Sequence, residues 1–86
     1  MSPAEALGHV RGYAGANRVR FSGHARQRMS ARGATVAHVL HALSNAAACV
    51  ASEQAGRWKA TGPDLDGDSL TAVVIIEDSV IVVTVF

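Results

Sequence analysis

Two runs of β-branched residues near the C-terminus constrain the fold more than any other feature of the sequence. Ser69–Ile76 and Val80–Phe86 are rich in Val, Ile and Thr, and only the polar residues 77–79 separate them. Such residues favour extended backbone, and a short polar break between two such runs is typical of a β-hairpin. The sequence therefore predicts an antiparallel hairpin at this end of the chain rather than a membrane span.

The core of the protein must be aliphatic. The chain has 86 residues, enough for one domain, and 49% of them are hydrophobic, yet it contains only one Trp, one Tyr and two Phe. Val, Ile, Leu and Ala must therefore fill the interior. The single cysteine, Cys49, excludes an intramolecular disulfide and fits a reducing compartment. Since no signal peptide is evident, we expect a cytoplasmic location.

Three helical segments are expected before the strand-like half of the chain. In each of them, a Ser or Thr that can cap a helix precedes residues with helical features. The third has the clearest buried face, because four aliphatic residues recur there at helical spacing between Val36 and Leu43. The expected caps are Ser2, Ser22 and Thr35, and the expected helix ends are residues 15–17, Gly33 and Asn45.

Helices first and strands afterwards indicate an α+β fold. Besides the hairpin, residues 48–52 and 57–61 have strand-like composition, and residues 62–68 have the composition of a turn. We expect one domain in which the N-terminal helices pack on one face of a three- to four-stranded antiparallel sheet. The expected parts of this domain, residues 1–86, are a helical extension (1–19), the helices (20–45) and the sheet (46–86).

The two halves of the chain carry opposite charge. Residues 1–45 hold six arginines and one acid, Glu5, for a net of +5. Residues 46–86 hold two cations and six acids, for a net of −4. The basic half can attract phosphates or an acidic partner, whereas the chain as a whole, at +1, is no polycation.

The helix expected over residues 23–32 carries the most promising chemistry. His24, Arg28 and Arg32 are spaced i, i+4, i+8, so they lie along one side of it, beside an apolar stripe that faces the core. Guanidinium groups bind phosphate through a planar fork, and histidine transfers protons near neutral pH. These groups suffice for metal-free cleavage of an RNA phosphodiester. From spacing alone, an ordinary solvated basic face is the simpler interpretation.

The run SGHARQRMSARG, residues 22–33, resembles the His-Ala-x-x-Arg-Met-x-x-Arg-Gly signature of an uncharacterised bacterial domain family. The turn at residues 66–67 and the ending at residues 82–86 resemble that family too, so the resemblance covers residues 20–86. The family is similar to RelE/ParE-like and colicin-type ribonuclease toxins. This resemblance implies a RelE-like fold and a toxin-like, metal-independent ribonuclease of a bacterial toxin–antitoxin or toxin–immunity system.

The resemblance also implies roles for particular residues and partners. The candidate catalytic residues are His24, Arg28 and Thr84, and the candidate phosphate-binding residues are Arg32, Arg26 and Lys59. No metal and no other cofactor is expected. The expected partners are RNA and a cognate antitoxin or immunity protein, and no membrane.

Two other functions are consistent with the same sequence. The basic helix 22–33 is also suited to a non-catalytic interaction module that binds RNA or an acidic protein partner. In addition, an exposed final strand, Val80–Phe86, would allow the protein to pair with a second copy as a homodimer.

Other candidate sites are weaker. His38, His41 and Cys49 are possible metal ligands, but their spacing matches no zinc motif, and we expect both histidines on the solvent side of their helix. Residues 64–68 resemble the start of a calcium loop but lack the glycine and glutamate that such a loop needs further on, so we expect an acidic turn. Trp58 is expected to anchor the core rather than to stack on a base.

Overall fold

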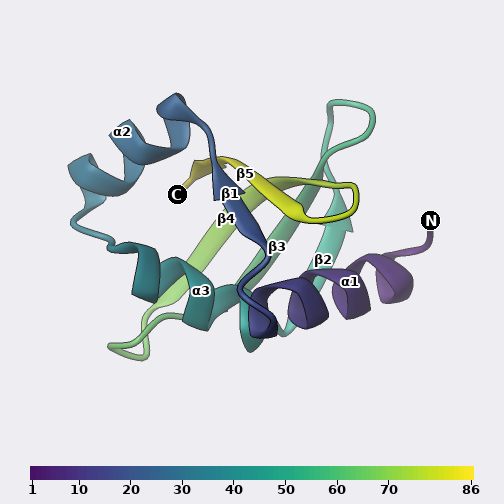
Figure 1. Ribbon diagram of the computed structural model, residues 1–86, viewed down its shortest axis with the longest axis horizontal. Coiled ribbons are helices and arrows are strands. Elements are labelled where there is room, and N and C mark those ends of the chain that lie inside the picture. The colour runs from purple at the N-terminus through teal and green to yellow at the C-terminus, as the bar shows by residue number, and fades with distance from the viewer.

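The structure, a computed structural model that describes residues 1–86, contains three helices and five strands (Figure 1). In chain order they are α1 (Pro3–Gly15), β1 (Val19–Phe21), α2 (Gly23–Arg32), α3 (Val36–Ser44), β2 (Ala48–Ala51), β3 (Trp58–Pro63), β4 (Ser69–Ile76) and β5 (Val80–Val85). The α+β class expected from the sequence is confirmed. None of the three helices combines the length and the apolar character that crossing a lipid bilayer requires.

All three expected helix caps are confirmed. The Ser2 hydroxyl accepts the Glu5 backbone N–H while the Glu5 carboxylate accepts the Ser2 backbone N–H, which completes a capping box. The backbone hydrogen bond from Ser2 also lowers the pKa of Glu5 below its usual value of 4.5. Ser22 and Thr35 cap α2 and α3, and Gly33 ends α2 with a φ of 76° that glycine adopts without steric cost.

The sheet has five strands rather than the expected three or four, and it is mixed rather than antiparallel. The strand order is β1-β5-β4-β3-β2, with β1 parallel to β5 and the other pairs antiparallel. The sequence pattern did not predict β1, because this strand is only three residues long and its middle residue is the exposed Arg20. β1 pairs with Val80–Val82 of β5, so the first half of the final strand lies between two strands, and only Val83–Val85 extend past β1. Homodimer formation itself stays a prediction.

The hairpin of β4 and β5 is present where the sequence predicts it. Its register shifts between Val73 and Val74, a bulge that leaves Thr84 opposite Val73. The strand before it, β3, ends two residues later than expected, because Pro63 still pairs with Ser69 of β4. The turn between β3 and β4 is correspondingly shorter.

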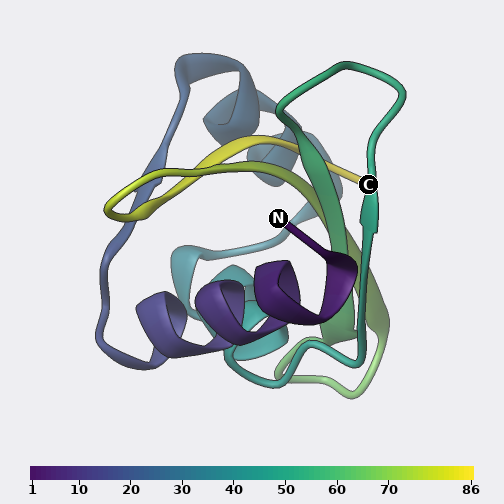
Figure 2. The same cartoon turned by 90° about the vertical axis from the view of Figure 1, so that its right-hand side faces the viewer.

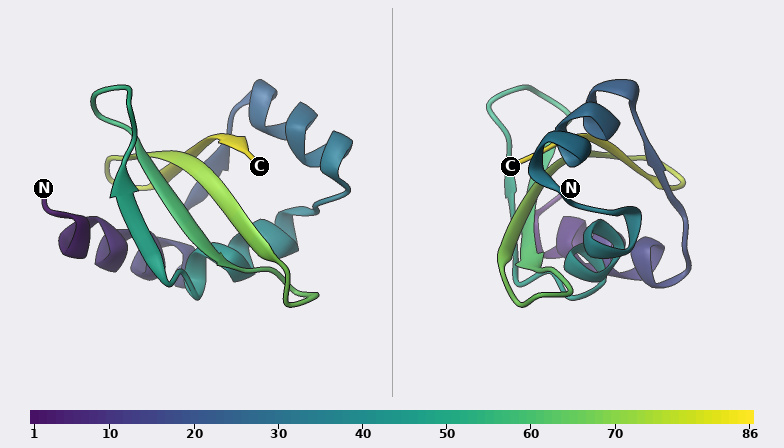
Figure 3. Two further views of the ribbon diagram at one scale, coloured as in Figure 1. Left: turned by 180° about the vertical axis from the view of Figure 1, so that it is seen from behind. Right: turned by 90° about the vertical axis from the view of Figure 1, so that its left-hand side faces the viewer.

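The helices are not equivalent in their packing. α1 and α3 lie against each other on one face of the sheet, whereas α2 lies apart from them and packs against β5 (Figures 1 and 2). Figure 3 shows the strands curving around α1 and α3. One core of 17 buried hydrophobic residues joins all three helices to the sheet, and it is aliphatic as expected. Its largest fully buried side chains are Leu43, Leu70, Val10, Val39, Val74, Val80, Val82 and Val85.

α3 approaches β3 so closely that only glycine fits at one position. A Cβ atom at Gly62 would overlap the backbone carbonyl group of Ala42. Immediately after this contact the chain enters the turn of residues 64–68. The contact therefore holds that turn beside α3.

Candidate functional site

The helix α2 is fixed to β5 by its cap and by two buried side chains. The Ser22 hydroxyl accepts the Ala25 backbone N–H and donates to the Val83 carbonyl oxygen, both at 3.0 Å. The Ser22 backbone N–H donates to the Val82 carbonyl oxygen, also at 3.0 Å. Ala25 and Met29 are buried in the core. Only one stripe of α2 is therefore covered, and the rest of the helix faces solvent.

The basic side chains of α2 are exposed and have no anionic partner. They are His24, Arg26, Arg28 and Arg32. The two ion pairs of the structure lie elsewhere. The Arg26 guanidinium lies 5.5 Å from the centre of the Phe21 ring, in cation–π contact. Arg32 Nη2 donates to the Ser69 carbonyl oxygen at 2.8 Å, a neutral acceptor that leaves its charge uncompensated.

Two of these arginines share a cleft of about 320 Å³ with the C-terminal end of β5. The lining residues are Arg28, Ala31, Arg32, Val85 and Phe86. Phe86 lines this cleft and is 54% exposed. An exposed aromatic ring can stack on a base while guanidinium groups hold the neighbouring phosphate. The arrangement is suited to a nucleotide of a single-stranded nucleic acid.

His24 lies one turn before Arg28 on the same helix but does not line the cleft. No hydrogen bond fixes its ring, in contrast to the rings of His38 and His41. The His24 side chain is exposed and is therefore free to change its rotamer. The structure thus brings Arg28 and Arg32 together in one cleft and leaves His24 and Arg26 on the surface beside it.

Thr84 and Lys59 lie on a different surface from the cleft. Both are in register with Val73 of β4, one on β5 and one on β3, so they share one face of the sheet. Consecutive residues of a strand point to opposite faces, and Val85 lines the cleft, so Thr84 points away from it. Lys59 Nζ lies 3.9 Å from Glu53 Oε1. The predicted site residues therefore fall into two spatial groups.

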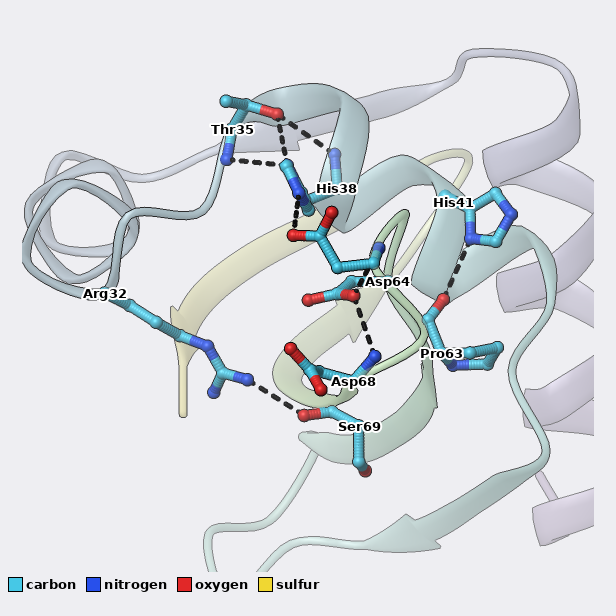
Figure 4. A network of polar contacts seen from close by, with 9 residues as sticks. Arg32, Thr35, His38, His41, Pro63, Asp64, Asp68 and Ser69 are labelled. Atoms are coloured by element: carbon cyan, nitrogen blue, oxygen red, sulfur yellow. Dashed lines mark hydrogen bonds and ion pairs between the residues drawn. The ribbon is translucent and has the colours of Figure 1, made fainter.

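A second polar cluster lies where the turn between β3 and β4 meets α3 (Figure 4). His38 Nε2 is 3.1 Å from Asp66 Oδ2, and His38 Nδ1 is 2.7 Å from Thr35 Oγ1. His41 Nδ1 is 2.9 Å from the Pro63 carbonyl oxygen. The expectation that both histidines face solvent is wrong, because the turn folds back over α3 and half buries them.

Asp64 is the buried acid of this cluster, with only 8% of its surface exposed. Its Oδ1 atom accepts the backbone N–H groups of Asp66 at 2.8 Å and Asp68 at 3.0 Å, which shapes the acidic turn expected from the sequence. One ring nitrogen of His38 and one carboxylate oxygen each of Asp64 and Asp66 all lie within 4.8 Å of one another.

Sequence reasoning missed two features of these sites, the aromatic wall of the cleft and the junction of His38 with the acidic turn. Phe86 is far from α2 in sequence, and Asp66 follows His38 by 28 residues, so tertiary packing alone creates both contacts. One further expectation is confirmed, because Trp58 packs against the core. Cys49 is buried. Burial raises the pKa of the Cys49 thiol.

The fold and its surface define a small α+β domain with an exposed cationic helix beside its final strand. Residues 21–86 match the family described as Domain of unknown function (DUF4258). The chain belongs to this family, and α1 lies before the matched region. The expected membership in an uncharacterised domain family is thereby confirmed. No curated protein and no solved structure matches the chain.

Proposed function

We propose that this protein is a toxin-like, metal-independent ribonuclease of a bacterial toxin–antitoxin or toxin–immunity system, and that the cleft beside α2 binds its substrate. The observation that carries the proposal is the pair of exposed guanidinium groups of Arg28 and Arg32 beside the exposed Phe86 ring. Exposed arginines without carboxylate partners are available to an external anion, and phosphate is the anion that their planar fork fits best. The resemblance stated above, through an uncharacterised domain family, to RelE/ParE-like toxins supports the choice of RNA.

The proposed reaction is an attack within the RNA backbone. His24 removes the proton of a 2′-hydroxyl group, and the 2′ oxygen attacks the adjacent phosphorus. The bond from phosphorus to the 5′ oxygen breaks, and this oxygen leaves with a proton from water. The products are a 2′,3′-cyclic phosphate and a 5′-hydroxyl end. Arg28 and Arg32 hold the non-bridging oxygens, whose negative charge is concentrated in the transition state.

The remaining predicted residues, in this proposal, contact RNA away from the scissile phosphate. Arg26 lies on α2 but outside the cleft lining, so we assign it to the phosphate of a neighbouring nucleotide. Thr84 and Lys59 lie on the sheet face that points away from the cleft, so we assign them to RNA that extends past the end of β5 rather than to the scissile phosphate. The direct chemistry then depends on His24, Arg28 and Arg32.

The cationic surface of α2 also supports the proposed protein partner. A cognate antitoxin or immunity protein with an acidic segment would neutralise the unpaired arginines and cover the cleft in a single interface. The cytoplasm, where RNA is abundant, is the compartment that the proposal implies.

A non-catalytic role is the second candidate. Its support is the position of His24 outside the cleft lining, because a cleft with two arginines and no proton-transfer group binds a phosphate without cleaving it. In that case α2 serves an interaction module for RNA or for an acidic protein. Cleavage products distinguish the two candidates.

The test is RNA cleavage in the presence of a chelator by the wild-type protein, by Arg28→Ala and by Arg11→Ala. Arg11 is also an exposed arginine, on α1 and outside the family match, so its variant removes the same charge at another place. We expect Arg28→Ala to slow cleavage by about 10²–10³-fold and Arg11→Ala to leave it unchanged. Equal loss in both variants would mean that only overall charge matters, and binding without cleavage by the wild type would favour the interaction module.

A further inference from the structure

The acidic turn and α3 bring three potential metal ligands together from two distant segments. His38 comes from the first turn of α3, and Asp64 and Asp66 come from the turn between β3 and β4. Their ligand atoms lie within 4.8 Å of one another, and the closest pair, His38 Nε2 and Asp66 Oδ2, is 3.1 Å apart. Ligands that bind one cation at 2.0–2.2 Å typically stand about 3–3.5 Å apart, so only a small inward movement is needed.

The charge balance of this cluster is independent evidence for a cation. Asp64 is 92% buried, because only 8% of its surface is exposed, and both of its hydrogen bonds end on Oδ1. Its other oxygen, Oδ2, accepts no hydrogen bond within the protein and is open to solvent, so it is free to bind a cation. No lysine or arginine forms an ion pair with it, since the ion pairs of the structure are His38–Asp66 and Lys59–Glu53. A buried carboxylate without a compensating charge is costly, and a bound cation removes that cost.

The histidine is already oriented for such a site. The Thr35 hydroxyl lies 2.7 Å from His38 Nδ1, and it holds the ring so that Nε2 points to the carboxylates (Figure 4). In the capping box, Nδ1 accepts the Thr35 backbone N–H at 3.4 Å, and Nε2–H donates to Asp66. Metal binding selects the other tautomer, in which Nδ1–H donates to Thr35 Oγ1 and Nε2 is unprotonated. A hydrogen bond of this kind to the second ring nitrogen is the usual companion of a metal-ligating histidine. Thr35 is fixed in turn, because it is the N-terminal cap of α3.

We propose that His38, Asp64 and Asp66 bind a divalent transition-metal cation of the zinc class. One imidazole nitrogen and two carboxylate oxygens suit zinc, which accepts both donor types, better than calcium or magnesium, which prefer oxygen alone. The Asp66 side chain is 72% exposed, so water completes the coordination from the solvent side. The bound cation joins the turn to α3 and stabilises the fold; it takes no part in the proposed RNA cleavage.

The experiment is a zinc titration of the full chain, followed by calorimetry and by thermal unfolding. We expect one zinc ion per chain and a rise in Tm of about 10 °C when free zinc exceeds its Kd a hundredfold. His38→Ala removes the nitrogen ligand. Asp64→Asn removes the carboxylate charge and keeps an oxygen that can accept the two backbone hydrogen bonds. Both variants should lose at least about 100-fold in zinc affinity, more than the loss of an outer contact causes.

His41→Gln is the matched control, because His41 lies on the same helix and contacts the same turn without belonging to the ligand set. It should bind zinc as the wild type does. Circular dichroism of each variant without metal checks that it is folded. The proposal is overturned if the wild type binds no zinc, if His38→Ala or Asp64→Asn binds it as tightly as His41→Gln does, or if calcium or magnesium binds equally well.

Discussion

The basic helix α2 and the acidic turn between β3 and β4 differ in how far their charged side chains are exposed and hydrogen-bonded. The charged groups of α2 are exposed and, apart from Arg32, make no hydrogen bond within the protein. The acidic turn instead buries Asp64 and fixes it through two backbone N–H groups. His38, from α3, contacts Asp66 of the same turn. The two regions meet at a single bond, from Arg32 to the Ser69 carbonyl oxygen at the start of β4.

This contrast distinguishes a surface that is available to bind an external anion from a site whose side chains are already held by hydrogen bonds. Exposed arginines remain hydrated and cost the fold little, so they are kept available for an external polyanion. A buried carboxylate is costly, so its retention requires hydrogen bonds or a compensating charge. Variants that affect one region and spare the other therefore test the comparison.

The largest expected effect is on the rate of RNA cleavage, and it distinguishes the role of His24 from that of the arginines of α2. His24→Ala should slow RNA cleavage by about 10²–10⁴-fold, because it removes the proton-transfer group. RNA affinity should change little, since the arginines that hold phosphate are untouched. Gel-based cleavage assays and binding to an uncleavable RNA measure the two quantities. A parallel loss of affinity and cleavage would show that His24 serves binding rather than proton transfer.

The next effect concerns the close contact that holds the acidic turn. Gly62→Ala should lower the free energy of unfolding by about 2–3 kcal/mol, because its Cβ would meet the Ala42 backbone. Urea denaturation measures this loss. The control is Gly8→Ala, whose Cβ meets no atom within 4 Å in α1 and which should stabilise the protein by about 0.5–1 kcal/mol. Equal effects in the two variants would refute the close approach of α3 to β3.

A smaller effect distinguishes the charge of Asp64 from its hydrogen bonds. In the absence of metal, Asp64→Ala should destabilise the protein by about 1–3 kcal/mol, because two backbone donors lose their acceptor. Asp64→Asn keeps an acceptor and removes the uncompensated charge, so its stability should equal or exceed that of the wild type. If Asp64→Asn is as damaging as Asp64→Ala, the negative charge itself stabilises the turn and the contrast with α2 is weakened.

The smallest effect comes from a buried group that is neutral. Burial holds the pKa of the Cys49 thiol above its usual value of 9.0, so the unfolded chain loses this proton first as the pH rises. Stability should therefore be unaffected by Cys49 below pH 9.0 and should decline from there up to the native pKa. Urea unfolding of the wild type and Cys49→Ala at pH 8 and pH 10 measures it. A wild type that loses no more stability than Cys49→Ala between these two pH values would contradict the burial of the thiol.

The predictable parts of the fold were those that local sequence determines. Ser2, Ser22 and Thr35 each cap a helix through hydrogen bonds within four residues, and the β4–β5 hairpin follows from two adjacent β-branched runs. β1 was not predictable, because its three residues become a strand only through parallel pairing with β5, far along the chain.

The candidate site also combines features that the local sequence predicts with features that only tertiary packing creates. The spacing of Arg28 and Arg32 along one helix was visible in the sequence, whereas Phe86 joins them only because α2 packs beside the end of β5. Likewise, His38 and the acidic turn each had a recognisable local pattern. Their junction depends on the packing of α3 against β3, which no local pattern encodes.

The most direct test of the central claim is to locate the nucleic acid on the protein. An RNA oligonucleotide with 2′-deoxy substitutions cannot be cleaved, and its titration can be followed by the chemical shifts of the backbone amides. We predict shifts in α2 and in residues 85–86, with little change in the acidic turn and in α1. Shifts concentrated on α1 or on the sheet face of Lys59, with none in α2, would contradict the assignment of the cleft as the RNA site.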